Sequence, residues 1–273
     1  MKKRILGLLI ALSVSIPAFA TIAVSPTRIE INANKIRNNY VTAAVQVSGD
    51  ETQPIRYRAY SGYFTISDKG ELVMEESKGD EHDISNKIRF VPSEFTVPPG
   101  KSQKLRVNIA NIKSLPEGES RAILYLEDIK TKEVNVPMST GIGAQLIVKT
   151  RIGVPVYVDK GKFVKKGEIE SFEIVKEKDG LYTKMKVLST GNSKIRYTGR
   201  VQIIQGKKLI GEYHLEERVV GSENSLVTKQ KIDLASIKDA GDYTLRAILS
   251  YDDQDGNRKN IKKDAILKIT GEI

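Results

Sequence analysis

The chain of 273 residues has no cysteine, no tryptophan and only two histidines. Without cysteine no disulfide can form, so stability must come from packed cores, and zinc sites built on thiolates are excluded. His82 lies in a charged loop and His214 lies between Tyr213 and Leu215, and neither has a second histidine at a metal-ligand spacing. We therefore expect no metal site.

Recognisable catalytic motifs are also missing. The G-x-S-x-G pattern of a nucleophile elbow does not occur. The glycines of Gly141-Ile142-Gly143 lack the third glycine and the following helix of a dinucleotide loop, and 252–257 lacks the ligand spacing of a calcium loop. We expect no cofactor and no enzymatic activity, so the function is binding. An enzyme with a dispersed site is the weakest alternative.

Long apolar runs are absent except at the start of the chain. The basic residues Lys2–Arg4 precede the apolar stretch Ile5–Ile16, and Ala18-Phe19-Ala20 has the small-x-small pattern of a cleavage site. We expect residues 1–20 to be a secretory signal peptide. The alternative is a membrane anchor, but the run is shorter than the roughly 20 residues that span a bilayer. The protein is then exported, with no stable membrane insertion.

The formal net charge is +10, and residues 1–20 carry three of these charges and no acid, which leaves +7. The basic residues are spread over the chain without a platform of aromatic side chains. Nucleic acid is therefore not an expected partner. A modest positive field favours an acidic partner or a free carboxylate.

Alternating apolar and polar residues dominate what is present. Examples are the ranges 29–32, 40–47, 55–63, 104–109 and 121–126. Short strands at this spacing predict an all-β fold of sandwich type. The length left after residue 20 suits two immunoglobulin-like β-sandwich domains in tandem, which we place at 21–158 and 159–273. The boundary follows an unusually long β pattern from Gly141 to Val158.

Turn signals organise the second half. Asp179-Gly180, Gln205-Gly206 and Asp255-Gly256 each separate two strand patterns and predict β-hairpins. The segment from Asp239 to Tyr243 has the D-x-G-x-Y form of a tyrosine corner, in which the hydroxyl is tied back to nearby backbone in immunoglobulin-like domains. An ordinary turn before a strand is the alternative.

Several segments in the range 22–158, taken in order, resemble the first domain of the PapD-like family of periplasmic pilus-assembly chaperones. They are Ala23–Ile31, Pro54–Tyr57, Phe90–Pro92, Phe95–Gln103, Leu115–Glu119, Leu124–Leu126 and Thr150–Ile152. The later part of the chain resembles the family only as an immunoglobulin-like sandwich. The resemblance implies a divergent, non-enzymatic chaperone of the periplasm, whose partners are pilin-like subunits and an outer-membrane usher.

The resemblance implies that the last strand of the first domain is lent to a subunit that lacks one strand. This is donor-strand complementation, and the chaperone then hands the subunit on for fibre assembly. The strand runs from Gly141 to Arg151, and its candidate subunit-facing residues share one face. They are Ile142, Ala144, Leu146 and Val148. The alternative is that these residues fill only the protein's own core.

The family also holds the terminal carboxylate of the subunit with two basic residues between its domains. Arg28 matches the first of them, and a guanidinium suits a carboxylate. The expected position of the second holds Gly153, so Arg151, two residues earlier on the same face, is the candidate substitute. For both arginines the alternative is a plain surface residue. The competing function is an exported immunoglobulin-like adhesion or cell-surface module.

Overall fold

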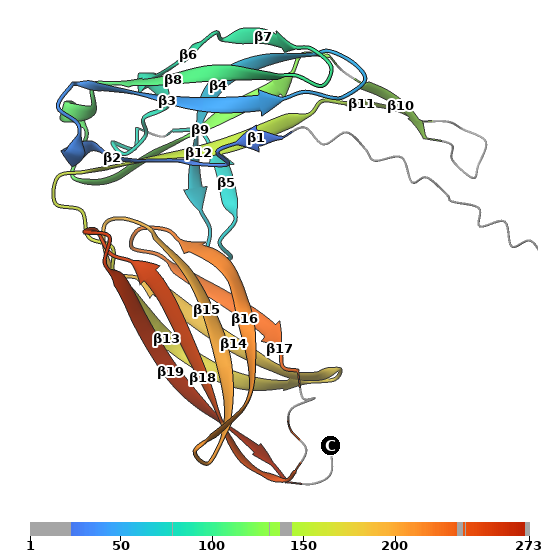
Figure 1. Ribbon diagram of the computed structural model, residues 1–273, viewed down its shortest axis with the longest axis vertical. Helices are drawn as coiled ribbons and strands as arrows, with labels where there is room; N and C mark the ends of the chain where they lie inside the picture. Colours follow the sequence, from blue (N-terminus) through green and yellow to red (C-terminus); the bar gives the residue numbers. More distant parts are fainter. Residues whose placement is uncertain are drawn as a thin grey trace, which may run out of the picture.

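The computed structural model describes residues 23–77, 79–130, 132–136, 144–233, 237 and 239–270, with the backbone alone for 132–136, 144–146 and 148. These residues form two β-sandwiches set at an angle to each other (Figure 1). The all-β, tandem immunoglobulin-like fold predicted from alternation is thus confirmed. The expected signal peptide, residues 1–20, lies outside the described residues.

The N-terminal sandwich, β1 to β12, places a four-stranded sheet, β1-β3-β8-β6, against a larger sheet, β2-β12-β9-β4-β5, in which β7 also pairs with β4. Its elements are β1 (Val24–Ser25), β2 (Ile29–Asn32), the 3-10 helix η1 (Ala33–Lys35), β3 (Tyr40–Ser48), β4 (Ile55–Ile66), β5 (Leu72–Glu75), η2 (Ser85–Lys87), β6 (Ile88–Val91), β7 (Glu94–Val97), β8 (Ser102–Ala110), η3 (Ile112–Ser114), β9 (Gly118–Asp128), β10 (Lys132–Val136), β11 (Ala144–Val148) and β12 (Arg151–Lys160).

The core of this sandwich is built from alternate residues of both sheets. Val45 and Val47 of β3 and Leu105 and Val107 of β8 are fully buried, and they pack in one cluster with Val156 of β12. Burying a side chain of this size stabilises a fold by about 1.5–3 kcal/mol. The sandwich therefore needs no disulfide.

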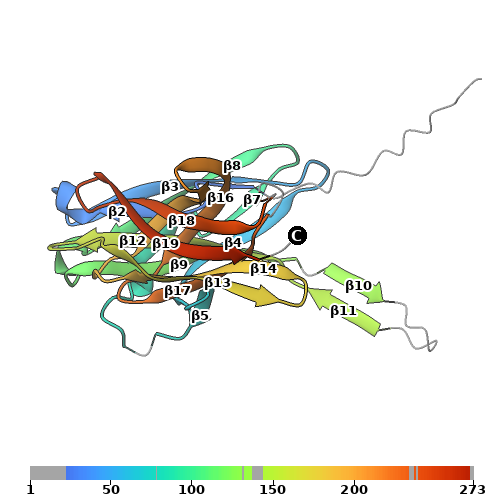
Figure 2. The ribbon, with the colours of Figure 1, turned by 90° about the horizontal axis from the view of Figure 1, so that it is seen from below.

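The long β pattern from Gly141 to Val158 is not one strand, contrary to the sequence prediction. β11 ends at Val148 and β12 begins at Arg151. β12 pairs with β9, whereas β11 pairs with β10 in a separate two-stranded sheet. The two pairs follow each other along one long hairpin, and β10 and β11 extend beyond the sandwich (Figures 1 and 2).

The C-terminal sandwich, β13 to β19, has a three-stranded sheet, β13-β14-β17, and a four-stranded sheet, β16-β15-β18-β19. Its strands are β13 (Gly167–Glu177), β14 (Gly180–Ser189), β15 (Ile195–Gln205), β16 (Lys208–Val220), β17 (Ser225–Lys231), β18 (Gly241–Asp252) and β19 (Arg258–Ile269). The three predicted hairpins are confirmed as β13–β14, β15–β16 and β18–β19. The tyrosine corner is confirmed too, because the Tyr243 hydroxyl donates to the Asp239 carbonyl at 2.6 Å.

The two sandwiches touch in several places besides the connecting chain. The hairpin of β4 and β5 reaches toward the C-terminal sandwich (Figure 1). There the Asn224 side chain donates to the carbonyl of Ile66 at 2.8 Å, and the Val227 amide donates to the carbonyl of Asp68 at 3.0 Å. These bonds hold the tip of the β4–β5 hairpin against the C-terminal sandwich.

Candidate functional site

The continuous outer edge of β11 and the first half of β12 is the main feature of the candidate site. Among the described strands, β11 pairs only with β10, and β2 joins β12 only from Val156 to Asp159. The opposite edge is taken by β10 and β9. An unpaired strand edge is a template for pairing with another chain. Residues 144–148 and 151–155 therefore offer an edge at which one more strand can add.

Toward the outer end of the β10–β11 hairpin the register pairs residues of like polarity, whereas nearer the sandwich Lys132 pairs with Val148 and Glu133 with Ile147. Val134 pairs with Leu146 and Val136 with Ala144, whereas Asn135 pairs with Gln145. Paired residues occupy the same face of an antiparallel ladder. The expected donor positions Ala144, Leu146 and Val148 thus fall in β11 at alternate places, and Ile142 lies outside the described residues. Ile147, at an intervening place, is 69% exposed.

A basic pocket lies between the two sandwiches, close to the start of β2. It has a volume of about 230 Å³ and is lined from β2 and β15, among other segments. Arg28 and Arg196 both approach the Oε1 atom of Glu217, at 3.4 and 3.1 Å. The same two arginines approach Oε1 of Glu30, at 3.4 and 3.3 Å. Two guanidinium groups from different sandwiches therefore share two carboxylates.

The electrostatics of this pocket favour negative charge. Burial opposes the ionisation of Glu30, but Lys194, Arg196, Arg28 and Lys165 outweigh it and lower the pKa of that carboxyl. The side chain of Lys194 is 3% exposed, so little water screens it. An entering carboxylate would meet Arg28 and Arg196, two of the cations that keep Glu30 ionised, whereas Lys194 is buried against Glu119.

Arg151 lies away from this pocket. The parallel pairing of Ile29 with Val156 sets Arg28 beside Pro155, four residues or about 13 Å along β12 from Arg151. The Arg151 guanidinium stacks on the ring of Tyr125 at 4.3 Å and donates to the hydroxyl of Tyr60 at 3.2 Å. Arg28 and Arg151 thus contact different groups in the described structure, although both belong to the face of the sheet that carries Tyr125 and Tyr157.

Gly153, at the expected position of the second basic residue, is held as glycine by its neighbour on β9. A Cβ atom built there would lie 2.6 Å from Cδ1 of Ile123, which is fully buried. Ile123 belongs to a small apolar cluster with Tyr125 and Tyr157. Apolar packing therefore occupies the space around this position, and a lysine there would need Ile123 to move.

Arg196 and Lys194 are among the residues of the pocket that the sequence did not reveal. Arg196 and Glu30 are separated by 166 residues in the chain, and they meet only because the two sandwiches pack together. The only local sign is two basic residues, 194 and 196, at alternate positions where β15 begins. Such a pattern also describes many solvated strands.

Two other features that would bear on function are metal-binding clusters and membrane-spanning helices. The structure contains no cluster of three or more potential metal ligands in the part of the chain that it describes. Among the same residues, no helix is long and apolar enough to cross a membrane.

No protein-family model and no curated protein matches the chain. Several solved structures are similar to the chain. The CupB2 chaperone of Pseudomonas aeruginosa is 14% identical, with a TM-score of 0.41, over 91% of this chain and 100% of that chain. A chain of the CsuC–CsuE chaperone–tip adhesion pre-assembly complex of Acinetobacter baumannii is 12% identical, with a TM-score of 0.45, over 89% and 98%. A chain of the SafA pilin–SafB chaperone complex of Salmonella enterica is 13% identical, with a TM-score of 0.42, over 91% and 97%.

These neighbours are a chaperone and two complexes, one of a chaperone with a tip adhesion subunit of Csu pili and one of a chaperone with a pilin, in agreement with the resemblance stated from the sequence. At such identities the likeness concerns the fold alone. What the chain does must be argued from its own residues.

Proposed function

We propose that this protein is a periplasmic chaperone that binds pilin-like subunits by donor-strand complementation and hands them on, through an outer-membrane usher, for fibre assembly. The observation that carries the proposal is the open edge of β11 and β12, which continues toward a pocket of basic side chains. The strand and the pocket offer two kinds of contact to one partner. Export through the predicted signal peptide would bring the protein to the periplasm.

The strand supplies the apolar part of the contact. A subunit that lacks one strand exposes both a strand edge and its core, and each is an aggregation hazard. Backbone hydrogen bonds from β11 would close the edge, while Ile142, Ala144, Leu146 and Val148 would enter the core. The larger of these side chains contribute about 1.5–3 kcal/mol each when buried, against which the costs of association must be set.

The pocket supplies the polar part. We propose that Arg28 and Arg196, rather than two residues of one sandwich, hold the terminal carboxylate of the bound pilin-like protein. Both guanidinium groups already contact Glu217, whose side chain is 44% exposed. An exposed ion pair contributes only about 0–1 kcal/mol. The terminal carboxylate of the partner can therefore replace Glu217 at small cost. Arg151 then remains a candidate for contact with the partner beside the lent strand.

Co-expression with a pilin-like subunit from a neighbouring gene tests the lent strand. We expect the subunit to be soluble and protease-resistant only with this protein, and Leu146→Asp to abolish the complex. Gln145→Asp, at the next position of β11, is the matched control and should keep it. Both variants should show the far-UV circular dichroism of the wild type. A subunit that is equally soluble and resistant alone would refute the chaperone function.

The carboxylate anchor is tested separately with synthetic peptides that carry the last residues of the pilin-like protein. Isothermal titration should show that a free carboxylate binds more tightly than the amide, and that Arg28→Gln and Arg196→Gln each remove the difference. Arg200→Gln is the matched control, because Arg200 lies on the same strand and pairs with Glu212 at 3.2 Å. Unchanged preference in Arg196→Gln would assign the anchor to other residues and leave the lent strand standing.

A further inference from the structure

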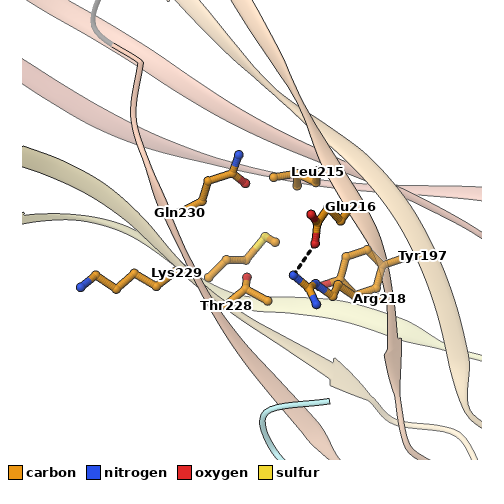
Figure 3. Close-up of a pocket in the computed structure, with 8 residues that line it drawn as sticks. Tyr197, Leu215, Glu216, Arg218, Thr228, Lys229 and Gln230 are labelled. Atoms are coloured by element: carbon orange, nitrogen blue, oxygen red, sulfur yellow. Dashed lines mark hydrogen bonds and ion pairs between the residues drawn. The ribbon is translucent and has the colours of Figure 1, made fainter. Parts of the chain in front are cut away.

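The C-terminal sandwich has a pocket of its own, at the side where its two sheets end. β16 is the last strand of the four-stranded sheet and β17 is the last strand of the other, and no described strand pairs with their outer edges. Between them lies a cavity of about 280 Å³ (Figure 3). Tyr197, Leu215 and Met185 line its inner part, and Arg218, Thr228 and Gln230 stand nearer the surface.

The hydroxyl of Tyr197, which lines this cavity, has no partner at full hydrogen-bonding geometry, although the Thr228 side chain lies close to it. Tyr197 is 1% exposed, and its hydroxyl is left unsatisfied. Buried polar groups are satisfied in most proteins, so an unsatisfied one needs an explanation. Burial raises the pKa of Tyr197 to about 12, while the charge of Arg218 and a weak hydrogen bond with the Thr228 side chain oppose that rise. The hydroxyl is therefore protonated at neutral pH and is able to donate.

The walls and the size of the cavity restrict what it can hold. Met185 and Leu215 offer apolar contact, and Met185 is 4% exposed. The volume falls just below the range of about 300–1,000 Å³ of sites for drug-sized ligands, which leaves room for one ring or one branched chain. A nucleotide or a flavin would not fit. The apolar part of the ligand is therefore no larger than one aromatic side chain.

The donors of the cavity favour an acceptor that carries negative charge. The Tyr197 hydroxyl has a proton to donate, and the Arg218 guanidinium lies on the same side of the sheet, because the two residues pair directly across β15 and β16. Arg218 is held at 2.7 Å by Glu216, whose side chain is 81% exposed. So exposed an ion pair is weak, and a ligand carboxylate can exchange with Glu216. Figure 3 draws this ion pair beside the ring of Tyr197.

We propose that this pocket binds a small amphipathic carboxylate, with its ring or branched chain between Met185 and Leu215 and its carboxylate at Tyr197 and Arg218. The same chemistry occurs in a free aromatic acid and in the last residue of a peptide chain. The site lies in the C-terminal sandwich and uses no residue of the strand or the anchor described above. It therefore stands independently of the chaperone function.

The chain carries its own reporters for a test by nuclear magnetic resonance. Met185 lines the pocket, whereas Met74 lies in β5 of the other sandwich and is 44% exposed. With methyl-labelled methionine, titration with 3-phenylpropionate should shift the Met185 signal to saturation and leave Met74 in place. The neutral 3-phenylpropanamide should bind about tenfold more weakly if Arg218 recognises charge. The peptide acetyl-Gly-Gly-Phe carries a free carboxylate at a chain end. If it binds more tightly than 3-phenylpropionate, the pocket recognises a chain end, and if it binds more weakly, the pocket recognises a free acid.

Variants identify the groups responsible. Tyr197→Phe should weaken 3-phenylpropionate about fivefold through one lost hydrogen bond, and Arg218→Gln about tenfold. The matched controls are Tyr213→Phe, whose hydroxyl lies 3.4 Å from Thr183, and Arg200→Gln. Both controls should bind as the wild type does. The proposal is overturned if the Met185 signal does not shift in the titration. It is also overturned if the acid and the amide bind with equal affinity both to the wild type and to a Tyr197→Phe variant whose methyl spectrum shows that it is folded.

Discussion

The ion pair between Lys194 and Glu119 joins the two sandwiches, and its removal tests what holds them together. The two side chains are 3% and 0% exposed, and Nζ lies 3.1 Å from Oε2. Removing one partner of a buried pair costs about 3–5 kcal/mol, because the other charge stays in a medium of low polarity. Lys194 also lies over the ring of Tyr157 at 3.6 Å, a contact that adds about 2 kcal/mol when desolvated.

The surroundings of Lys194 place the cost of Lys194→Met at the lower end of the range of about 3–5 kcal/mol. Glu119 would keep the backbone amide of residue 194, at 3.0 Å, and the guanidinium of Arg121, 3.8 Å from its other oxygen. A methionine would also keep contact with the Tyr157 ring. We expect a loss of about 3 kcal/mol in the free energy of unfolding. The double variant with Glu119→Gln removes both charges and should lie within about 1 kcal/mol of the wild type, so it should be more stable than Lys194→Met alone.

Urea unfolding at neutral pH, followed by far-UV circular dichroism and by tyrosine fluorescence, measures these differences. Two probes are needed because two sandwiches need not unfold together. Lys184→Met, at an exposed position of β14, is the matched control and should change stability by less than about 0.5 kcal/mol. The reasoning fails if Lys194→Met costs less than about 1 kcal/mol, or if the two substitutions are simply additive.

Three further outcomes follow from single contacts. The pKa of Glu30 is lowered in the fold, so its stabilising contribution is complete above the ordinary value of 4.5 and is lost as pH falls through the folded pKa. Glu30→Gln removes this contribution and should therefore make stability fall less steeply in acid. Thermal unfolding between about pH 3 and 6 measures the difference. Gly153→Lys should destabilise the N-terminal sandwich by about 1–3 kcal/mol, and the addition of Ile123→Ala should recover part of that loss in urea titrations; no recovery would mean that Ile123 is not the obstacle. Tyr243→Phe removes the bond to the carbonyl of Asp239 and should cost about 1 kcal/mol or more, since that carbonyl loses its partner; an unchanged midpoint would mean that water replaces the hydroxyl.

Local patterns carried much of the fold. The turns at Asp179-Gly180 and Gln205-Gly206 close hairpins because their glycines adopt a positive φ, of 145° and 59°, which other residues avoid. The D-x-G-x-Y segment that ends at Tyr243 forms its corner because the tyrosine hydroxyl bonds to a carbonyl only four residues earlier. Each of these features needs no knowledge of distant parts of the chain.

Features set by the long-range meeting of segments could not be foreseen in the same way. The alternation from Gly141 to Val158 predicts one strand, yet β12 pairs with β9 and β11 with β10, and the break at 149–150 depends on where these partners lie. The pairing of Arg28 with Glu217 joins residues 189 positions apart. Only the packing of one sandwich on the other shows that Arg196 shares the pocket with Arg28.

The alternation in β11 also has a consequence for accuracy. A partner strand that adds to this edge one residue out of phase would face Gly143, Gln145 and Lys149 in place of Ile142, Leu146 and Val148. Only Ile147 would offer a large apolar group in that arrangement. A misaligned complex would therefore leave the core of its partner largely unfilled and would dissociate sooner. Under the proposed function, the strand would therefore retain a partner only when the two strands are correctly aligned.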